Sequence, residues 1–384
     1  MEPFPAVLVG GPPHSGKSVL TYSLSQALRQ RGIEHYVVRA APDGEGDWAN
    51  EADQELVRIL RFKGDFDPAF VHFVCQSITQ RHLPLLVDAG GRPTPAQERI
   101  LECCTHAILL NPDEASRAHW RSLATRYGLS VVAELTSDLY GPGRVDEQER
   151  VVRGVISGLE RGQTATGPAF EALVERLAIL LARDAEELYR WHESCCPVET
   201  VIHLGRLART FGLGLEGQQV RWEPCHLPSI LEYLPEATPL ALYGRGPNWL
   251  YAAVALLAAP AALVQFDPRL GWVQAVSLRL QEPGPTDSLS ITIHSIENCL
   301  LLQISSPVIL DYNQLESVSV PPLPPGWGVV LSGKLPLWLY TSLALTYRAA
   351  PWVAVYQPQL EQAVVVYSAI ESRAVGETIP ICLS

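Results

Sequence analysis

The segment Gly-Pro-Pro-His-Ser-Gly-Lys-Ser at residues 11–18 has the residue types and the spacing of a loop that binds phosphate. It fits the pattern G-x-x-x-x-G-K-[ST], in which two glycines let the backbone wrap around phosphate groups. The N–H groups and the positive end of a following helix then face the anion. We therefore expect a nucleoside triphosphate to be bound by Gly11, Pro12, Pro13, His14, Ser15, Gly16, Lys17 and Ser18.

Three roles follow from the chemistry of this loop. Lys17 is expected to act catalytically on the β- and γ-phosphates, and Ser18 to ligate Mg²⁺. Asp88 ends an apolar run at 83–87, where the acidic partner on the magnesium side is found. A carboxylate that caps a turn is the alternative for Asp88. ATP is preferred only by default, because no guanine-recognition motif is present.

Arginines near the predicted site are candidates for stabilising charge on a transferred phosphoryl group. They are Arg92, Arg117 and Arg121, of which the last two are four residues apart and share a helix face. A solvated basic face is the alternative. No clear general base is present in the sequence.

Short apolar runs alternate with amphipathic stretches around the loop, which is the pattern of a mostly parallel sheet with helices on both faces. The apolar runs predict strands at 6–9, 35–38, 83–87, 107–110 and 131–135. The amphipathic stretches predict helices at 18–31, 51–62, 68–81, 95–104 and 114–127.

The chain changes character after this predicted sheet. Residues 136–167 are polar and glycine-rich, with one helix expected at 146–159. Residues 169–192 have the spacing of a strong amphipathic helix, which would connect two domains or mediate dimerisation; a helix packed on its own domain is the alternative. We place a P-loop domain at 1–165, a linker helix at 166–196, and two further domains at 197–283 and 284–384.

Composition limits the classes of function. The chain has 384 residues with a formal net charge of −12, so it is not expected to bind duplex nucleic acid, which requires many cations. The eight cysteines form no Cys-x-x-Cys pair, which favours free thiols in a reducing cytoplasm. The sequence shows no signal peptide and no confident membrane span, so we expect a cytoplasmic protein without a membrane partner.

An internal repeat occupies the last part of the chain. Its copies run over 239–276 and 328–366. Each copy contains an apolar strand, a Gly-Arg or Gly-Lys turn, Pro-x-Trp-Leu-Tyr at the start of a short helix, Ala-Ala-Pro, a second apolar strand and x-Pro-x-Leu. This order of matches over about forty residues indicates a duplicated α/β unit.

The repeats resemble the small ring nucleases of type III CRISPR systems, which work as stacked dimers. The resemblance lies in Gly244-Arg245-Gly246-Pro247-x-Trp249-Leu250 and Phe266-Asp267-Pro268-Arg269-Leu270-Gly271 of the first copy, and in Leu331-Ser332-Gly333-Lys334-x-Pro336-x-Trp338-Leu339 and Pro351-Trp352-Val353-Ala354-Val355-Tyr356 of the second. That family is also known fused to a P-loop domain. The resemblance implies an α/β fold with an N-terminal P-loop sheet, a linker helix and two tandem ring-nuclease-like domains.

The family binds and cleaves cyclic tetra-adenylate, so the resemblance implies that partner here, in a homo-oligomer or a stacked assembly. The implied ligand-binding residues are Gly244, Arg245, Gly246, Ser332, Gly333, Lys334 and, as a phosphate clamp, Arg348. The family's histidine before the Ala-Ala-Pro proline is absent from both copies, and its Asp is Asp267 in the first copy but Gln357 in the second.

Loss of the imidazole removes the obvious group for proton transfer, so both copies are expected to be impaired as nucleases. His203, His226 and His294 are expected to be structural. Three functions remain open: a P-loop ATPase or kinase gated by messenger binding, a ring nuclease in which Asp267 is essential and ATP controls assembly, and a scaffold that binds without turnover.

Overall fold

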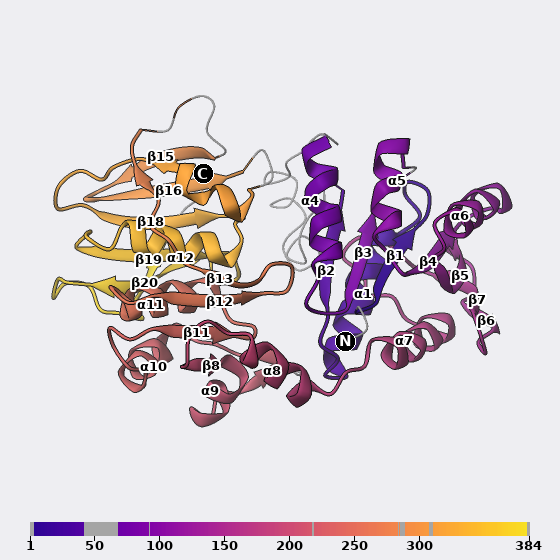
Figure 1. The fold of residues 1–384 in the computed structure, drawn as a ribbon, viewed down its shortest axis with the longest axis horizontal. Coiled ribbons are helices and arrows are strands. Elements are labelled where there is room, and N and C mark those ends of the chain that lie inside the picture. The colour runs from indigo at the N-terminus through magenta and orange to yellow at the C-terminus, as the bar shows by residue number, and fades with distance from the viewer. Residues whose placement is uncertain are drawn as a thin grey trace. The chain divides into compact units, whose positions relative to one another are not determined.

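The computed structural model describes residues 4–41, 68–91, 93–216, 219–282, 284, 289–306 and 310–381 (Figure 1). The helix expected at 51–62 and Arg92 lie outside these residues. The chain forms two compact units, one of residues 1–190 with 268–271, and one of residues 191–267 with 272–384. No helix among the described residues is long and apolar enough to cross a membrane.

The first unit is built on a seven-stranded sheet of order β2-β3-β1-β4-β5-β7-β6. All neighbouring strands are parallel except β6, which runs antiparallel to β7 at one edge. The strands are β1 (Ala6–Gly10), β2 (Tyr36–Ala40), β3 (Leu85–Ala89), β4 (His106–Asn111), β5 (Ser130–Asp138), β6 (Arg144–Glu147) and β7 (Val152–Ser157).

Helices cover both faces of this sheet, because its central strands are apolar on both sides. Side chains such as Val7 and Val9 pack with α1 (Lys17–Gln30) and α7 (Pro168–Leu181) on one face. Their neighbours Ala6 and Leu8 pack on the other face with α4 (Pro68–Thr79), α5 (Pro95–Glu102) and α6 (Glu114–Arg126). The two-residue alternation of a strand thus divides one apolar run between two cores. The α/β fold class predicted from the sequence is confirmed.

The helix expected at 146–159 is wrong. This stretch forms β6 and β7, an antiparallel pair at the edge of the sheet. Val152, Val155 and Ile156 are buried in β7, as β-branched residues in a strand tend to be. Gly154 is required there, since a Cβ atom at this position would lie 2.1 Å from the Arg144 carbonyl oxygen.

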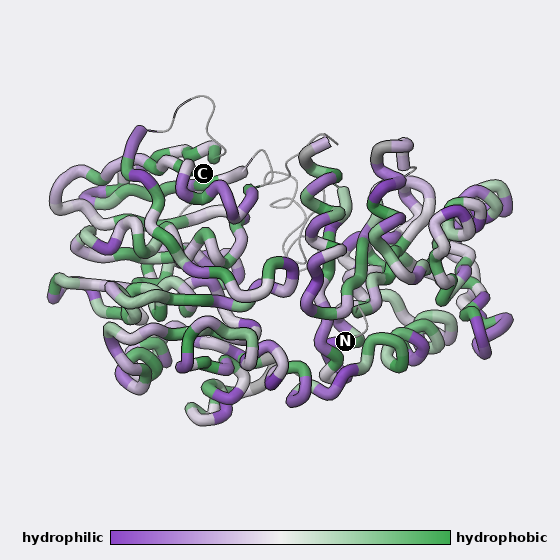
Figure 2. The backbone as a smooth tube through the Cα atoms, viewed as in Figure 1, coloured by the Kyte–Doolittle hydropathy of each residue, from purple (hydrophilic) through white to green (hydrophobic). Residues whose placement is uncertain are grey.

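The stretch expected to form one linker helix contains two, α7 and α8 (Ala185–Ser194). Apolar side chains of α7, including Phe170, Leu173 and Leu177, belong to the core beneath the first unit's own sheet. Hydrophobic and hydrophilic residues alternate around α7 (Figure 2). This helix is therefore packed on its own unit, which was the alternative that the sequence left open.

The two larger sheets of the second unit share one design. The first has the order β13-β12-β11-β8, with β8 (Val201–His203), β11 (Leu240–Tyr243), β12 (Leu263–Asp267) and β13 (Gly271–Gln274). The second has the order β15-β16-β18-β19-β20-β21, with β15 (Ser290–Ile296), β16 (Cys299–Ser305), β18 (Gly328–Gly333), β19 (Trp352–Gln357), β20 (Gln362–Ser368) and β21 (Thr378–Pro380). Three parallel strands, β8-β11-β12 and β16-β18-β19, are common to both.

One helix connects the second and third of these strands in each copy: α11 (Asn248–Ala258) and α12 (Leu337–Thr346). Both helices are predominantly apolar and almost wholly buried, and they pack against each other. The smaller elements of this unit are α9 (Leu204–Thr210), β9 (Leu215–Glu216), β10 (Gln219–Val220), η1 (Pro224–His226), α10 (Leu227–Tyr233), β14 (Arg279–Leu280), η2 (Tyr312–Ser317), β17 (Ser319–Val320) and η3 (Pro358–Leu360).

Candidate functional site

The predicted phosphate loop connects β1 to α1 at the carboxyl edge of the first unit's sheet. Gly16 has φ +88° and Gly11 lies so close to β4 that a Cβ atom would be 2.2 Å from the Leu110 carbonyl oxygen. His14 also has a positive φ, of 62°. Both glycines are thus required by the backbone, since L side chains avoid these conformations and contacts. The loop leaves the first N–H groups of α1 available to an anion.

Lys17 is buried at the start of α1, and its Nζ atom donates a hydrogen bond of 2.7 Å to the Pro12 carbonyl oxygen. Burial lowers the pKa of Lys17, and the negative charge of Asp88 partly offsets this effect. Ser18 follows at the exposed first turn. A triphosphate at this loop would add further negative charge beside this buried ammonium group.

Asp88 lies at the end of β3, beside β1, and only 6% of its surface is exposed. Its Oδ2 atom accepts a hydrogen bond of 2.6 Å from Arg39 Nη1, and its Oδ1 atom is buried without a partner among the described residues. Arg39 was not singled out in the sequence; it is the residue directly opposite Asp88 in the β2–β3 register. An unpartnered carboxylate oxygen beside Lys17 fits a group that binds Mg²⁺ through water or directly.

Asn111 is a second group that the sequence interpretation missed. It ends β4, two residues beyond Leu109, which pairs with Gly10 of the β1 strand, so it lies beside the phosphate loop. Its side chain has no exposed surface, and neither its Oδ1 nor its Nδ2 atom has a partner in the described part of the chain. Ser15 Oγ in the loop is also buried and has no partner among the described residues. A polar residue closing an otherwise apolar run was the available signal.

Such groups are rare in folded proteins because an unpaired buried polar group costs about 1–3 kcal/mol. Three of them, on Ser15, Asp88 and Asn111, lie at the carboxyl ends of β1, β3 and β4. In open α/β sheets this edge is where ligands bind. The residues present therefore fit a polar anionic ligand with its cation.

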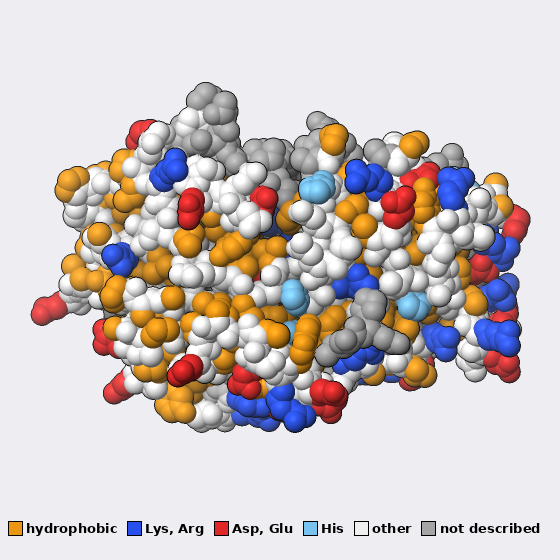
Figure 3. All heavy atoms as spheres, in the orientation of Figure 1, with side chains coloured by type: hydrophobic (Ala, Val, Ile, Leu, Met, Phe, Trp, Pro, Cys, Tyr) orange, Lys and Arg blue, Asp and Glu red, His pale blue; other side chains and the backbone are white. Residues whose placement is uncertain are grey.

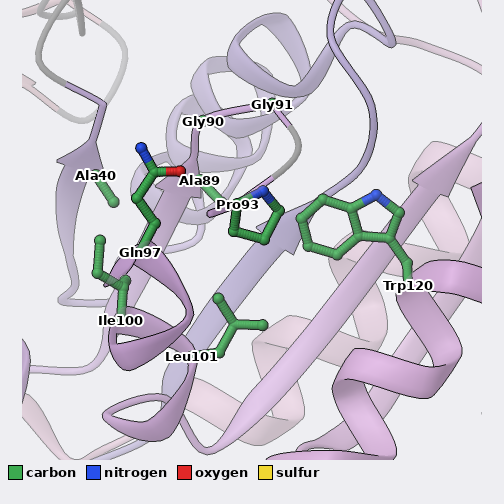
Figure 4. Close-up of a pocket in the computed structure, with 9 residues that line it drawn as sticks. All are labelled: Ala40, Ala89, Gly90, Gly91, Pro93, Gln97, Ile100, Leu101 and Trp120. Carbon is green, nitrogen blue, oxygen red and sulfur yellow. The ribbon is translucent and has the colours of Figure 1, made fainter. Parts of the chain in front are cut away.

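A hollow lies next to this edge, beside Ala89 at the end of β3 (Figure 4). Its lining is apolar apart from one amide, that of Gln97, whose Oε1 atom accepts from the Thr94 N–H at 2.8 Å. Trp120 forms one wall. The loop after β3 also touches the phosphate loop, because a Cβ atom on Gly91 would lie 2.7 Å from Pro13 Cγ. The lining residues are Ala40, Ala89, Gly90, Gly91, Pro93, Gln97, Ile100, Leu101 and Trp120.

The two arginines of α6 are paired with side chains of their own unit. Arg121 donates to both oxygens of Glu134, at 2.5 and 2.8 Å, and Arg117 donates to Glu114 at 2.6 Å and to Thr136 at 2.8 Å. Figure 3 shows basic and acidic side chains mixed over the end of the unit that holds α6. Contact with Arg121 holds the pKa of Glu134 below its usual range. These pairings favour a structural role for both arginines over a role at the phosphates.

In the second unit the Gly-cation turns occupy equivalent places. Gly244 follows β11 with φ +111°, and Gly333 ends β18 with φ +148°. A Cβ atom on Gly333 would lie 1.9 Å from the Ile304 carbonyl oxygen. Arg245 and Lys334 come next and are exposed, whereas Ser332 is buried. Both turns therefore present a cation at the carboxyl end of the middle one of three parallel strands.

The tyrosine of each Pro-x-Trp-Leu-Tyr segment fixes its own turn. Tyr251 donates a hydrogen bond of 2.6 Å to the Gly244 carbonyl oxygen, and Tyr340 donates one of 2.5 Å to that of Gly333. Burial raises the pKa of Tyr340 to about 12, so the hydroxyl keeps its proton at neutral pH. The tyrosine thus makes the same hydrogen bond to its glycine turn in both copies.

The two turns lie on the same side of the unit. Asn248, which follows the first turn, donates to the carbonyl oxygen of Tyr356 near the end of β19 at 3.3 Å. Its side chain also hydrogen-bonds Tyr340 and thereby opposes the burial effect on the pKa of that tyrosine. A second link between the copies joins Thr341 Oγ1 to Gln265 Oε1 at 3.0 Å. The copies thus bring their glycine turns to one edge.

Asp267 ends β12 and is 9% exposed. The strand registers put Asp267 beside Gly244, and Gln357 beside Gly333 in the other copy. The charge of Asp267 adds to the burial that raises the pKa of Tyr251. The structure therefore gathers Gly244, Gly246, Arg245 and Asp267 at the first turn, and Ser332, Gly333 and Lys334 at the second.

Arg348 is not brought to this edge. It follows the carboxyl end of α12, whereas Lys334 precedes the start of that helix. Ten helical residues separate the two positions by about 15 Å.

Two of the histidines expected to be structural lie in secondary-structure elements of this unit. His203 caps α9, where its Nδ1 atom accepts from the Arg206 N–H at 3.4 Å, and His294 lies in the edge strand β15.

The class of the protein is thus a two-unit α/β protein, with a phosphate-loop candidate in one unit and a duplicated strand–turn–helix design in the other. Residues 303–380 match the family model described as CRISPR-associated protein (Cas_csx3). The matched segment contains the second turn, α12 and the strands β18 to β21. The match indicates a CRISPR-associated protein and supports a CRISPR-related role.

Proposed function

We propose that this protein binds a cyclic oligoadenylate, cyclic tetra-adenylate in the first instance, at the edge formed by its two glycine turns. The binding is coupled to ATP binding, hydrolysis or phosphoryl transfer by the first unit. The observation that carries the proposal is the duplicated turn with one exposed cation in each copy, Arg245 and Lys334, on a single side of the unit. The CRISPR-related match of residues 303–380 agrees with it.

The chemistry of the ligand supports this choice. A cyclic oligoadenylate is a ring of phosphates, and such a ring requires N–H donors and cations related by approximate two-fold symmetry. The tyrosine hydrogen bonds engage the glycine carbonyl oxygens, which are the atoms of the turn that would repel phosphate. Because the chain carries a net charge of −12, an anion needs a local basic site of this kind.

For the first unit, the buried unpartnered groups at the carboxyl edge support ATP with Mg²⁺ as ligand. Lys17 would hold the β- and γ-phosphates, while Ser18 and Asp88 would hold the metal ion, which supplies charge neutralisation when it is bound. The chain's own loop N–H groups orient the phosphates, and Arg39 fixes the Asp88 carboxylate. These roles support an enzyme that is either an ATPase or a kinase.

Messenger binding is tested by titrating the full chain with cyclic tetra-adenylate in a calorimeter. The double variant Arg245→Ala/Lys334→Ala should lose binding by at least about 100-fold, since each charge-assisted contact is worth about 1.5–3 kcal/mol. Arg348→Ala, an exposed cation at the far end of α12, is the matched control and should bind like the wild type. Equal binding by the double variant would exclude the two turns as the site.

Turnover is tested by following messenger cleavage and phosphate release together, with and without ATP and Mg²⁺. Phosphate release that rises with messenger and disappears in Lys17→Ala supports the proposal. Asp267 beside the first turn favours one alternative, a surviving ring nuclease, in which cleavage would be lost in Asp267→Ala. Binding without either turnover would identify a messenger-binding scaffold. The homo-oligomeric or stacked assembly implied by the resemblance is tested by light scattering with and without messenger.

A further inference from the structure

A group of potential metal ligands in the second unit belongs to neither proposed site. It surrounds η1, a single 3₁₀ turn between β10 and α10. Glu223 immediately precedes the turn, and Cys225 and His226 lie within it. A carboxylate oxygen, the thiol sulfur and an imidazole nitrogen of these residues lie within 4.8 Å of one another.

The geometry of the group is close to that of a tetrahedral site. In such a site the ion lies about 2.3 Å from sulfur and about 2.0–2.1 Å from nitrogen and oxygen, which separates the ligand atoms by roughly 3.3–3.6 Å. Cys225 Sγ already lies 3.8 Å from Glu223 Oε2. The separation of these two atoms is therefore close to that in an occupied tetrahedral site.

Within the group the Cys225 thiol donates a hydrogen bond to Glu223 Oε2, whereas one imidazole nitrogen has no partner in the described part of the chain. His226 Nδ1 is buried and has no hydrogen-bond partner among the residues that the structure describes, which is a cost in a folded protein. The other oxygen of Glu223, Oε1, accepts from Arg221 Nε at 3.0 Å, so the carboxylate is oriented with Oε2 toward the thiol. A ligating carboxylate is commonly held by such a partner.

The turn itself is held in place by its packing. Pro224 opens the 3₁₀ turn, and its carbonyl oxygen lies against Gly376, where a Cβ atom would approach to 2.6 Å. Gly376 has φ +84° and belongs to the segment between β20 and β21. The ligands thus stand on a turn whose backbone packs closely against Gly376, while Cys225 is exposed and gives an ion access from solvent.

We propose that Glu223, Cys225 and His226 bind one Zn²⁺ ion, with water in the fourth position. A thiolate, an imidazole and a carboxylate form a ligand set for zinc, whereas Mg²⁺ and Ca²⁺ select oxygen ligands. The thiolate and the carboxylate together neutralise the charge of the ion. This site is independent of the messenger and ATP proposals, and it is tested without either ligand.

The test uses the full chain, freed of purification tags and stripped with a chelator. Titration with Co²⁺ should give one equivalent of tetrahedral d–d absorption together with a thiolate-to-cobalt charge-transfer band, both displaced by Zn²⁺. In Cys225→Ser the charge-transfer band should vanish, and Zn²⁺ affinity should fall by more than the roughly 10–100-fold that loss of an outer partner costs. Cys195→Ser, another exposed thiol of this unit, is the matched control and should leave both unchanged.

A second variant keeps the proposal falsifiable. His226→Ala retains the thiolate, so it should keep the charge-transfer band while weakening binding and altering the d–d bands. An unchanged cobalt spectrum in Cys225→Ser would overturn the proposal, as would equal loss in Cys195→Ser. Failure of the stripped wild type to bind Co²⁺ or Zn²⁺ would also overturn it.

Discussion

Replacing Asn111 with valine should stabilise the protein without nucleotide and weaken its binding of ATP. The amide is fully buried and has no partner in the part of the chain that the structure describes, so its removal relieves a penalty of about 1–3 kcal/mol. Valine has a similar size and suits the end of a strand. For a unit of this size the midpoint of thermal unfolding should rise by roughly 2–12 °C, at about 2–4 °C per kcal/mol. The affinity for ATP should fall at least about tenfold, which corresponds to 1.4 kcal/mol.

The assay is calorimetric unfolding of the full chain with and without ATP and Mg²⁺, in which the transition of the first unit is the one that ATP shifts. Gln265→Met provides the contrast, because that buried amide accepts from Thr341 Oγ1 at 3.0 Å. Its removal should destabilise the second unit by about 1 kcal/mol. A lower midpoint for Asn111→Val without ATP, or an unchanged shift by ATP, would refute the assignment of this group to the ligand.

Three further predictions follow from the structure. Contact with Arg121 lowers the pKa of Glu134 in the folded state below 4.5. The ionised carboxylate therefore stabilises the fold above pH 4.5, and this contribution is lost as the pH falls through the pKa of the folded state. Glu134→Gln should make the free energy of unfolding, measured in urea, depend less on pH in the acid range. Gly333→Ala places a Cβ atom 1.9 Å from the Ile304 carbonyl oxygen and imposes φ +148° on alanine, so the turn must move. The affinity for cyclic tetra-adenylate should therefore fall at least tenfold. A variant that binds with wild-type affinity would contradict this close approach. Burial lowers the pKa of Lys17, and a bound triphosphate should raise it again. ATP binding therefore takes up a proton when the pH exceeds the lowered pKa, so the ATP affinity measured by calorimetry should decrease toward pH 10.5. Lys17→Arg, which stays charged over this range, should show no such decrease.

Much of the first unit is determined locally. Gly11 and Gly16 mark the loop because no other residue fits those backbone positions, and apolar runs of strand length predict the central strands. The same logic failed at residues 146–159, where charged residues mask an edge strand pair. Whether an edge strand forms depends on the strand that it pairs with, and here the close approach of Gly154 to Arg144 allows the pairing. The spacing of apolar residues within one segment does not predict such a contact.

The candidate sites divide in the same way. The sequence by itself determined which residue types recur, Gly244 with Arg245 and Gly333 with Lys334, because a turn with positive φ depends on its own residues. Only the tertiary structure decided that both turns face one edge, through packing of the two buried helices, and that Arg348 lies away from it. It alone paired Arg39 with Asp88 and left Asn111 unpartnered, because hydrogen bonds between strands join residues that are distant in the chain.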